Sequence, residues 1–364
     1  MAAFGPLDGI RTLEFAGLGP APFACMMLAD MGAEVVRIER VAPDAAQDAA
    51  FTVHRGRAAR LVLDLKDPPQ AEQALSLARS ADLLIEGFRP GVMERLGLGP
   101  ADCLAANRRL VYGRMTGWGQ NGPLSGEPGH DINYLALSGA LHATGPAERP
   151  MPPLSLIGDY AGAMNFAFGL LAALHAARTT GKGQIVDAAM LDSAALLMAI
   201  FYGFHAHGQW IDKREANMVD GGAYYYGAYE CADGKFVAIG AIEPQFHDPL
   251  MAALGIADLP ADAQWNRSLW PALRERVAAA FRTRTRDDWA RRLETASACL
   301  SPVLSMEEAP HHPHNVARGL FGHRERAADP APAPRFSETA CGSRGFSPSP
   351  EESAEVLRRW RAAS

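Results

Sequence analysis

The stretch from residue 10 to residue 39 restricts the fold more than any other. A β-rich segment at 10–16 is followed by a turn rich in glycine and proline, an apolar helix at 23–31 and a second strand at 34–39. Two strands joined through one helix over so short a stretch form a βαβ unit, in which the strands are parallel and the crossover is right-handed. The chain is therefore predicted to contain a parallel sheet covered by helices.

The alternation of strands and helices continues along the chain. Further elements are predicted at 61–65, 69–81, 82–88, 100–109 and 110–118. A long apolar helix at 161–179, a strand at 184–190 and another apolar helix at 193–208 follow. Alternation on this scale is typical of an open, doubly wound α/β domain with a parallel sheet, which we place at residues 1–221.

A second, smaller domain is predicted at 222–325. The segments 224–231 and 235–241 flank Asp233-Gly234, a strong signal for the turn of a β-hairpin, and helical segments follow. This pattern indicates an α+β domain. The remaining residues, 326–364, are rich in proline, alanine and serine at first, and we expect them to return to the large domain as a C-terminal tail.

Composition excludes several functional classes. The net charge of −6 argues against a protein that coats nucleic acid. Five cysteines without a C-x-x-C pair suggest reduced thiols and a cytoplasmic location, and the apolar stretches are too short or too interrupted to predict a membrane span. The glycine-rich turn after the first strand lacks the third glycine of the dinucleotide fingerprint, so we expect no nicotinamide or flavin cofactor. The histidines at 311–314 have no clear set of partner ligands, and we expect no metal there.

Two residues at the edges of one loop could carry proton chemistry. His130 lies in the segment 129–134, and Asp159 lies in the segment 158–162, just before the long apolar helix. The chain between them is dense in proline and glycine and is predicted to be a loop. Each residue also has a structural alternative, since His130 could cap a helix and Asp159 could be an ordinary N-cap.

An imidazole and a carboxyl group on opposite sides of a carbon acid suit a racemase. One group removes the proton and the other delivers a proton to the opposite face, with the roles exchanged for the other enantiomer. The enolate formed between the two steps needs backbone amides directed at its oxygen. The amides at the start of the helix after Asp159 are candidates for that role.

A third candidate is Glu243, which follows the second strand of the predicted hairpin and precedes Pro244. A carboxylate in this position could orient an imidazole from another domain. The alternative is an acidic residue at the start of a helix, where the helix dipole favours a negative charge.

Basic residues fall at the carboxyl ends of the predicted strands. Arg37, Lys66 and Arg89 occupy such positions, and Arg95 lies about one turn beyond Arg89. The loops at these ends form the ligand crevice of a doubly wound sheet, and converging guanidinium and ammonium groups suit phosphates. Any one of them could belong to a solvated rim, but together they favour a ligand.

Several motifs in order resemble the class III CoA-transferase superfamily. They are Gly5-Pro-Leu-Asp-Gly-Ile-Arg11, Gly32-Ala-Glu-Val-Val-Arg-Ile-Glu39, Leu63-Asp-Leu-Lys66 and Glu86-Gly-Phe-Arg-Pro-Gly-Val92. Within that superfamily, other segments are similar to the α-methylacyl-CoA racemase branch. These are Arg114–Gln120, Gly129–Tyr134, Asp187–Met190 and Gly240–Phe246. The resemblance covers nearly the whole chain and fades after about residue 325.

The resemblance implies a racemase that interconverts (R)- and (S)-2-methylacyl-CoA thioesters through an enolate. It implies an interlocked homodimer of ring-like chains, with no metal or organic cofactor because coenzyme A is part of the substrate. His130 and Asp159 would be the acid/base pair, and Glu243 would orient His130 across the subunit boundary. The positions that match CoA-binding positions of the family are Arg37, Leu63, Asp64, Leu65, Lys66, Gly87, Phe88, Arg89, Arg95, Gly129, Asp131, Ile132, Asn133 and Tyr134.

Two other functions compete with racemisation. In a CoA-transferase, the carboxylate matching Asp159 would attack the acyl group as a nucleophile and form a mixed anhydride. His130 favours the racemase, because a transferase needs no second acid/base group on the opposite face. The third possibility is a CoA-binding protein without catalysis. The sequence does not identify the acyl group, but Phe15, Leu18, Met190 and the tyrosines at 224–226 could line a wide apolar surface for it.

Overall fold

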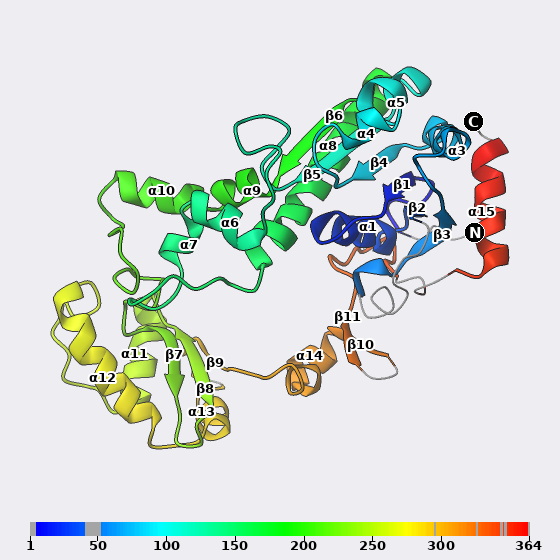
Figure 1. Cartoon of the computed structure of the whole chain (residues 1–364). Coiled ribbons are helices and arrows are strands. Elements are labelled where there is room, and N and C mark those ends of the chain that lie inside the picture. Colours follow the sequence, from blue (N-terminus) through cyan, green and yellow to red (C-terminus); the bar gives the residue numbers. More distant parts are fainter. Residues whose placement is uncertain are drawn as a thin grey trace. The chain divides into compact units, whose positions relative to one another are not determined.

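The computed structural model describes residues 5–40, 52–294, 296–324, 327–342, 345 and 348–362. The chain forms two compact units, which we describe separately (Figure 1). Unit 1 comprises Met1–Ser138, Leu154–Leu197 and Phe321–Ser364, and unit 2 comprises Gly139–Pro153 and Met198–Leu320. The domain boundary predicted between residues 221 and 222 falls within unit 2, and the one predicted between 325 and 326 lies outside the described residues.

Unit 1 is built on a six-stranded sheet with the order β3-β2-β1-β4-β5-β6, in which each recorded pairing is parallel. The strands are β1 (Arg11–Phe15), β2 (Glu34–Glu39), β3 (Arg57–Val62), β4 (Leu83–Glu86), β5 (Val111–Thr116) and β6 (Ile185–Ala189). The strand order reverses between β1 and β4, and in sheets of this kind ligands bind beyond the carboxyl ends of the strands at that point. The predicted α/β fold with a parallel sheet is confirmed.

Helices cover both faces of this sheet (Figure 1). The long helix α8 (Gly162–Thr180) packs beside α1 (Pro20–Asp30) on one face, where Phe166 and Leu170 lie among the buried apolar side chains. Gly113 in β5 permits this contact, because a Cβ atom there would lie 2.6 Å from the Phe166 ring. The close approach of α8 to the sheet therefore depends on a glycine in β5.

The second face of the sheet is covered by helices from both ends of the unit. They are α3 (Pro68–Arg79), α5 (Pro100–Ala106) and the C-terminal α15 (Pro350–Ala362). Trp360 of α15 is completely buried in the core of this face, and its indole N–H donates to Glu34 over 2.6 Å. The end of the chain is thus part of the core of unit 1.

The apolar segment Leu156–Thr180 is, by length and composition alone, long and apolar enough to cross a bilayer. The apolar side chains of its α-helical part, α8, such as Phe166 and Leu170, are buried in the core of unit 1, and a core helix of a folded domain has the same apolar composition. The first residues of the segment, Leu156–Ala161, form a π-helical turn where the sequence predicted a loop and the start of an α-helix. The apolar helix predicted at 193–208 is instead two helices, α9 (Met190–Leu197) and α10 (Ala199–Ala206), separated at Met198.

Unit 2 contains a three-stranded antiparallel sheet, β7 (Tyr226–Glu230), β8 (Phe236–Gly240) and β9 (Leu300–Pro302), in which the predicted hairpin is confirmed. Gly234 takes a positive φ of 72° in its turn, as the Asp-Gly pair requires. The main helices of unit 2 are α11 (Pro244–Ala253), α12 (Trp270–Phe281) and α13 (Arg286–Leu293).

Shorter elements occur in both units. They are α4 (Val92–Arg95), α6 (Asp131–Leu137), α7 (Ala140–Ala143), α14 (Pro313–Ala317), β10 (Phe321–Arg324) and β11 (Ala327–Pro330).

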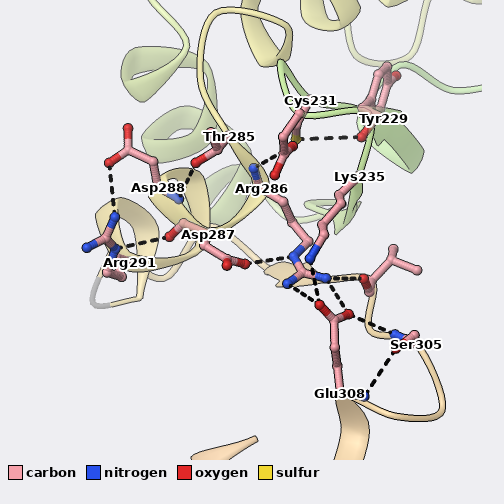
Figure 2. A network of polar contacts seen from close by, with 12 residues as sticks. Tyr229, Cys231, Lys235, Thr285, Arg286, Asp287, Asp288, Arg291, Ser305 and Glu308 are labelled. Carbon is pink, nitrogen blue, oxygen red and sulfur yellow. Dashed lines mark hydrogen bonds and ion pairs between the residues drawn. The ribbon is translucent and has the colours of Figure 1, made fainter.

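Arg286 ties α13 to the segment after β9 (Figure 2). Its guanidinium is buried and donates to both carboxylate oxygens of Glu308, at 2.7 and 3.0 Å, and Lys235 donates to the same carboxylate. The two cations hold the pKa of Glu308 well below its ordinary value, with Arg286 the larger cause. This bidentate ion pair fixes the segment after β9 to the start of α13.

Candidate active site

A hollow of about 470 Å³ opens in unit 1 where the strand order reverses. Its walls come from the segments that follow β1, β4, β5 and β6 at their carboxyl ends, and from the loop before α6. His130 and Asp159 both line it. The two residues that the sequence singled out for proton chemistry are therefore brought to one cavity.

His130 is the N-cap residue of α6, and its backbone N–H donates to the side chain of Asn133 over 3.0 Å. This local hydrogen bond fixes the backbone from which the imidazole extends. The side chain is exposed and lines the hollow. His130 thus occupies the helix start of the structural alternative, and its ring is exposed on the wall of the hollow.

Asp159 lies within the π-helical turn Leu156–Ala161, so it is not the ordinary N-cap of the structural alternative. The two residues before this turn, Leu154 and Ser155, have positive φ values of 56° and 57°. Non-glycine residues in this conformation and π-helical turns both concentrate at functional sites. The backbone strain therefore lies next to the carboxyl group that the sequence analysis selected.

The surroundings of Asp159 raise its pKa to about 6. The largest cause is burial, which disfavours the charged carboxylate, and the negative charge of Asp131 adds to it, while His130 acts in the opposite direction. A carboxyl group with this pKa exists in both protonation states near neutral pH. It can therefore act as either acid or base.

Asp131 is buried, with 4% of its surface exposed, and its Oδ1 accepts hydrogen bonds from the amides of Gly158 (2.8 Å) and Asp159 (3.0 Å). The next amide of the turn, that of Tyr160, donates to the carbonyl oxygen of Ser155. The amides around Asp159 are thus already bonded. This corrects the expectation that they would hold an enolate oxygen.

An aromatic pair forms the wall of the hollow next to His130. The rings of Trp118 and Tyr134 meet edge to face with their centroids 4.7 Å apart. Gly129 allows the chain to pass beside them, because a Cβ atom there would lie 2.8 Å from Tyr134 and 3.0 Å from Trp118. The predicted residues Gly129 and Tyr134 therefore shape this wall, whereas the sequence analysis did not select Trp118.

A second hollow, of about 570 Å³, lies at the carboxyl ends of β2, β3 and β4. Phe88 lines both hollows. The predicted CoA-binding residues Leu63, Asp64, Leu65, Lys66 and Arg95 line the second one, and Gly87 and Arg89 line the first. Arg40, which sequence reasoning missed, lies in the second hollow with its guanidinium 5.7 Å from the centre of the Phe88 ring. Its place one residue after β2 was the signal that could have identified it.

Arg37 differs from the other predicted phosphate ligands. It is 3% exposed and donates to Glu14 over 2.6 Å and to Glu39 over 3.0 Å. Arg57 donates to the same Glu14. Burial alone would raise the pKa of Glu14, but Arg57 and Arg37 hold it below its ordinary value. These contacts favour a structural role for Arg37 beneath the loops of the crevice.

The residues expected around the acyl chain divide between the hollow and the core. Leu18 and Met190 line the first hollow, and Leu18 is 87% exposed. Phe15 is buried in the core of unit 1, and Tyr224 and Tyr225 are buried in unit 2, so the expectation that these three line an acyl surface is wrong. Their aromatic composition reflects core packing.

Glu243 belongs to unit 2 and is the N-cap residue of α11. The amides of Phe246 and His247 donate to its carbonyl oxygen. The backbone of Glu243 is therefore at the start of a helix, as the alternative interpretation expected. That the Glu243 carboxylate orients His130 stays a prediction. Within the described part of the chain, no cluster of three or more histidine, cysteine or acidic side chains could hold a metal ion.

Comparison with known proteins places this geometry in a family. The sequence model of CoA-transferase family III matches residues 7–351. The chain is 41% identical to α-methylacyl-CoA racemase of Mus musculus over 97% of this chain and 93% of that protein, and 42% identical to the Homo sapiens protein of the same name over 92% and 87%.

The fold has a solved counterpart in the crystal structure of Rv3272 from M. tuberculosis, with a TM-score of 0.80 at 27% identity over 96% of this chain and 98% of that one. That protein is named "Probable fatty acyl-CoA transferase". The match to the family model extends over almost the full length, and the racemases are covered nearly completely by this chain. The chain therefore belongs to CoA-transferase family III.

Proposed function

We propose that this protein is an α-methylacyl-CoA racemase, which inverts the configuration at the α-carbon of 2-methyl-branched acyl-CoA thioesters. The observation that carries the proposal is the presence of His130 and Asp159 on the wall of one hollow, with the pKa of Asp159 raised to about 6. The identity of more than 40% to two racemases over nearly the whole chain supports it.

The reaction moves one proton off the α-carbon and another onto its opposite face. When the neutral imidazole of His130 accepts the α-proton, the electron pair of the C–H bond moves into the thioester and forms an enolate. The protonated carboxyl of Asp159 then donates its proton to the α-carbon, and the thioester carbonyl is restored. For the other enantiomer, the Asp159 carboxylate accepts the proton and the His130 imidazolium donates one.

The enolate oxygen needs a donor close to the acid/base pair. The amide of Asp131 is the first of α6 and follows His130 directly, and no residue in the described part of the chain accepts a hydrogen bond from it. We therefore place the thioester oxygen at this amide in preference to those around Asp159. A backbone amide held by its helix needs no rearrangement as charge develops on the oxygen.

The coenzyme A portion fits the second hollow. Lys66, Arg95 and Arg40 supply positive charge for its phosphates, and Phe88 connects this hollow with the one that contains the acid/base pair. Coenzyme A is part of the substrate, and the proposed reaction uses neither a metal nor an organic cofactor.

We further propose that the enzyme is a cytoplasmic homodimer with interlocked subunits. In unit 1, Leu196 and Leu197 of α9 are more than half exposed, and in unit 2, Ile200 and Tyr202 of α10 are more than half exposed. Exposed apolar surface of this kind is typical of protein interfaces. In such a dimer, we expect Glu243 of one subunit to orient His130 of the other.

A CoA-transferase is the second candidate function. The specific observation in its favour is that Asp159 lines the hollow and is partly ionised at neutral pH, as a carboxylate nucleophile must be. His130 in the same hollow favours the racemase, because nucleophilic transfer requires no proton carrier on the second face of the α-carbon.

Proton exchange distinguishes the two functions. The protein is incubated in D₂O with each enantiomer of a 2-methylacyl-CoA, with and without an isotopically labelled free carboxylic acid. Deuterium at the α-carbon and inversion without the acid are expected, whereas transfer of CoA to the labelled acid without α-exchange would contradict the racemase proposal. His130→Gln should abolish inversion, and the matched control His175→Gln, on an exposed position of α8, should leave it unchanged.

A further inference from the structure

A buried carboxylate lies behind the acid/base pair. Asp131 follows His130 in the chain, and its side chain has 4% of its surface exposed. Its Oδ1 accepts the amides of Gly158 and Asp159, so this one oxygen connects the start of α6 with the turn that carries Asp159. The Asp131 side chain therefore binds the backbone of this turn, whereas the family resemblance implies that this position binds CoA.

The turn at Gly158 is built around this oxygen. A Cβ atom on Gly158 would lie 2.5 Å from Asp131 Oδ1, closer than any side chain could be accommodated without displacing the carboxylate. Leu154 and Ser155, just before the turn, adopt the left-handed conformation. A backbone strained in this way persists only where other contacts hold it. Asp131 supplies two such contacts.

We propose that Asp131 is a positioning residue for Asp159, whose two hydrogen bonds to the amides of Gly158 and Asp159 fix the Asp159 carboxyl on the wall of the hollow that His130 also lines. This inference rests on the proposed racemase function. Asp131 contacts neither the substrate nor the transferred proton through its side chain, and it acts only through Asp159.

The charge of Asp131 has a second consequence. It disfavours the ionised form of Asp159 and so, after burial, contributes to the raised pKa of that residue. An acid/base pair that works in both directions needs a carboxyl group that is present in both protonation states at the pH of the reaction. The charge of Asp131 thus helps to raise the pKa of Asp159 into the range in which its carboxyl group can both donate and accept a proton.

Several other titratable groups lie in the hollow or on the elements around Asp159. His130, Tyr134, Arg89 and Glu127 line the same hollow, Tyr160 lies on the same turn with its ring against Phe23, α1 contributes Cys25 and Asp30, and α9 contributes Asp192. Asp30 is paired with Arg55, and Asp192 is exposed. Among all of these, Asp131 is the one that raises the pKa of Asp159 by its charge, while His130 lowers it.

Asp131→Asn separates the two contributions. An asparagine oxygen can still accept both amides, but the negative charge is lost. The pKa of Asp159 should then fall below about 6, because the ionised carboxylate no longer faces a like charge, while burial continues to hold it above its ordinary value. Asp131→Ala also removes the hydrogen bonds, and misplacement of the carboxyl should lower kcat roughly 10- to 100-fold with little change in KM. Gly158→Ala displaces the same carboxylate and should resemble Asp131→Ala.

Two readouts test the inference. The first is the NMR titration of ¹³C-labelled aspartate carboxyls, with the Asp159 signal identified by its loss in Asp159→Asn, and the second is the pH profile of α-proton exchange. A lower NMR midpoint for Asp159 is expected in Asp131→Asn. For the enantiomer whose α-proton Asp159 removes, the acid limb of the exchange profile should move to lower pH as well, because the carboxylate must be ionised to accept that proton. Asp187→Asn is the control, since Asp187 accepts the amide of Gln120 outside the hollow and should change neither readout.

The outcomes separate this inference from the racemase proposal. An unchanged midpoint and an unchanged acid limb in Asp131→Asn, with wild-type kcat in Asp131→Ala, would refute the positioning role. A wild-type protein without α-proton exchange would overturn the racemase proposal, and the NMR midpoint, which needs no turnover, would still decide whether Asp131 controls Asp159. If Asp131→Ala does not fold, the near-isosteric Asp131→Asn carries the test.

Discussion

If one group of the proposed acid/base pair is removed, the other group should still exchange the α-proton of one enantiomer with solvent. Asp159→Asn keeps the shape of the side chain but can neither accept nor donate the catalytic proton. The enantiomer whose α-proton faces His130 can still be deprotonated, and its enolate can be reprotonated by the same imidazole after exchange with solvent. We therefore expect Asp159→Asn to exchange the α-proton of one enantiomer with retention of configuration, and to lose exchange of the other.

The size of the effect follows from the protonation of Asp159. With a pKa of about 6, about one Asp159 side chain in eleven is protonated at pH 7, against about one in 1,600 for a carboxyl at the ordinary value of 3.8. The site therefore increases the supply of the acid form about 150-fold at this pH. Loss of a general acid/base group ordinarily costs about 10²–10⁴ in rate, and we expect inversion to fall within that range in both directions.

The assay follows each pure enantiomer in D₂O by ¹H NMR for exchange and by chiral chromatography for inversion. His130→Gln serves as the mirror experiment, with exchange retained only for the enantiomer that Asp159→Asn no longer exchanges. Retention of inversion by Asp159→Asn would refute the two-group mechanism. Equal loss of exchange for both enantiomers, with binding intact, would instead indicate that Asp159 acts as a nucleophile.

Three further perturbations test other parts of the structure. Trp360 is buried in the core of unit 1, so Trp360→Ala should lower its free energy of unfolding by about 3–5 kcal/mol, measured by denaturant titration. An unfolding midpoint equal to that of the wild type would contradict the docking of α15. Gly117→Ala places a methyl group against the hydroxyl of Tyr134, which lines the hollow, and should reduce kcat/KM of the folded protein. Wild-type kinetics would show that Tyr134 can move without loss of activity. Glu243→Gln should lower kcat, because its partner imidazole loses an orienting carboxylate, and a wild-type pH–rate profile would limit Glu243 to the start of α11.

The sequence predicted the sheet of unit 1 because its strands alternate with helices at regular intervals. β2 was predicted with its observed bounds, and the hairpin of unit 2 followed from Asp233-Gly234. β3 begins at Arg57, four residues before the strand predicted at 61–65. In the structure, Arg57 is buried on Glu14 of β1, and such a long-range ion pair gives no local signal.

The same reason explains why Arg37 was selected as a phosphate ligand. Its position on β2, close to the carboxyl end of the sheet, is correct, and basic residues at such ends ordinarily serve ligands. Whether its charge faces solvent depends on Glu14 and Glu39, which only the folded sheet brings to it. Arg40, three residues later, has the exposure that Arg37 lacks and lies in the hollow. Position along a strand therefore identifies the edge of a site but not the side chain that reaches the ligand.

The protonation of Asp159 illustrates how a catalytic property arises from distant parts of the chain. The segment around Asp159 shows a carboxyl before an apolar helix, which on its own indicates an N-cap. Its pKa is set by burial and by Asp131, which lies 28 positions earlier and bonds to its backbone amide. Only a glycine at 158 leaves room for that contact. The segment that begins at His130 and the turn that carries Asp159 are thus joined by direct hydrogen bonds, and a substitution of Asp131 should change the proton affinity of Asp159.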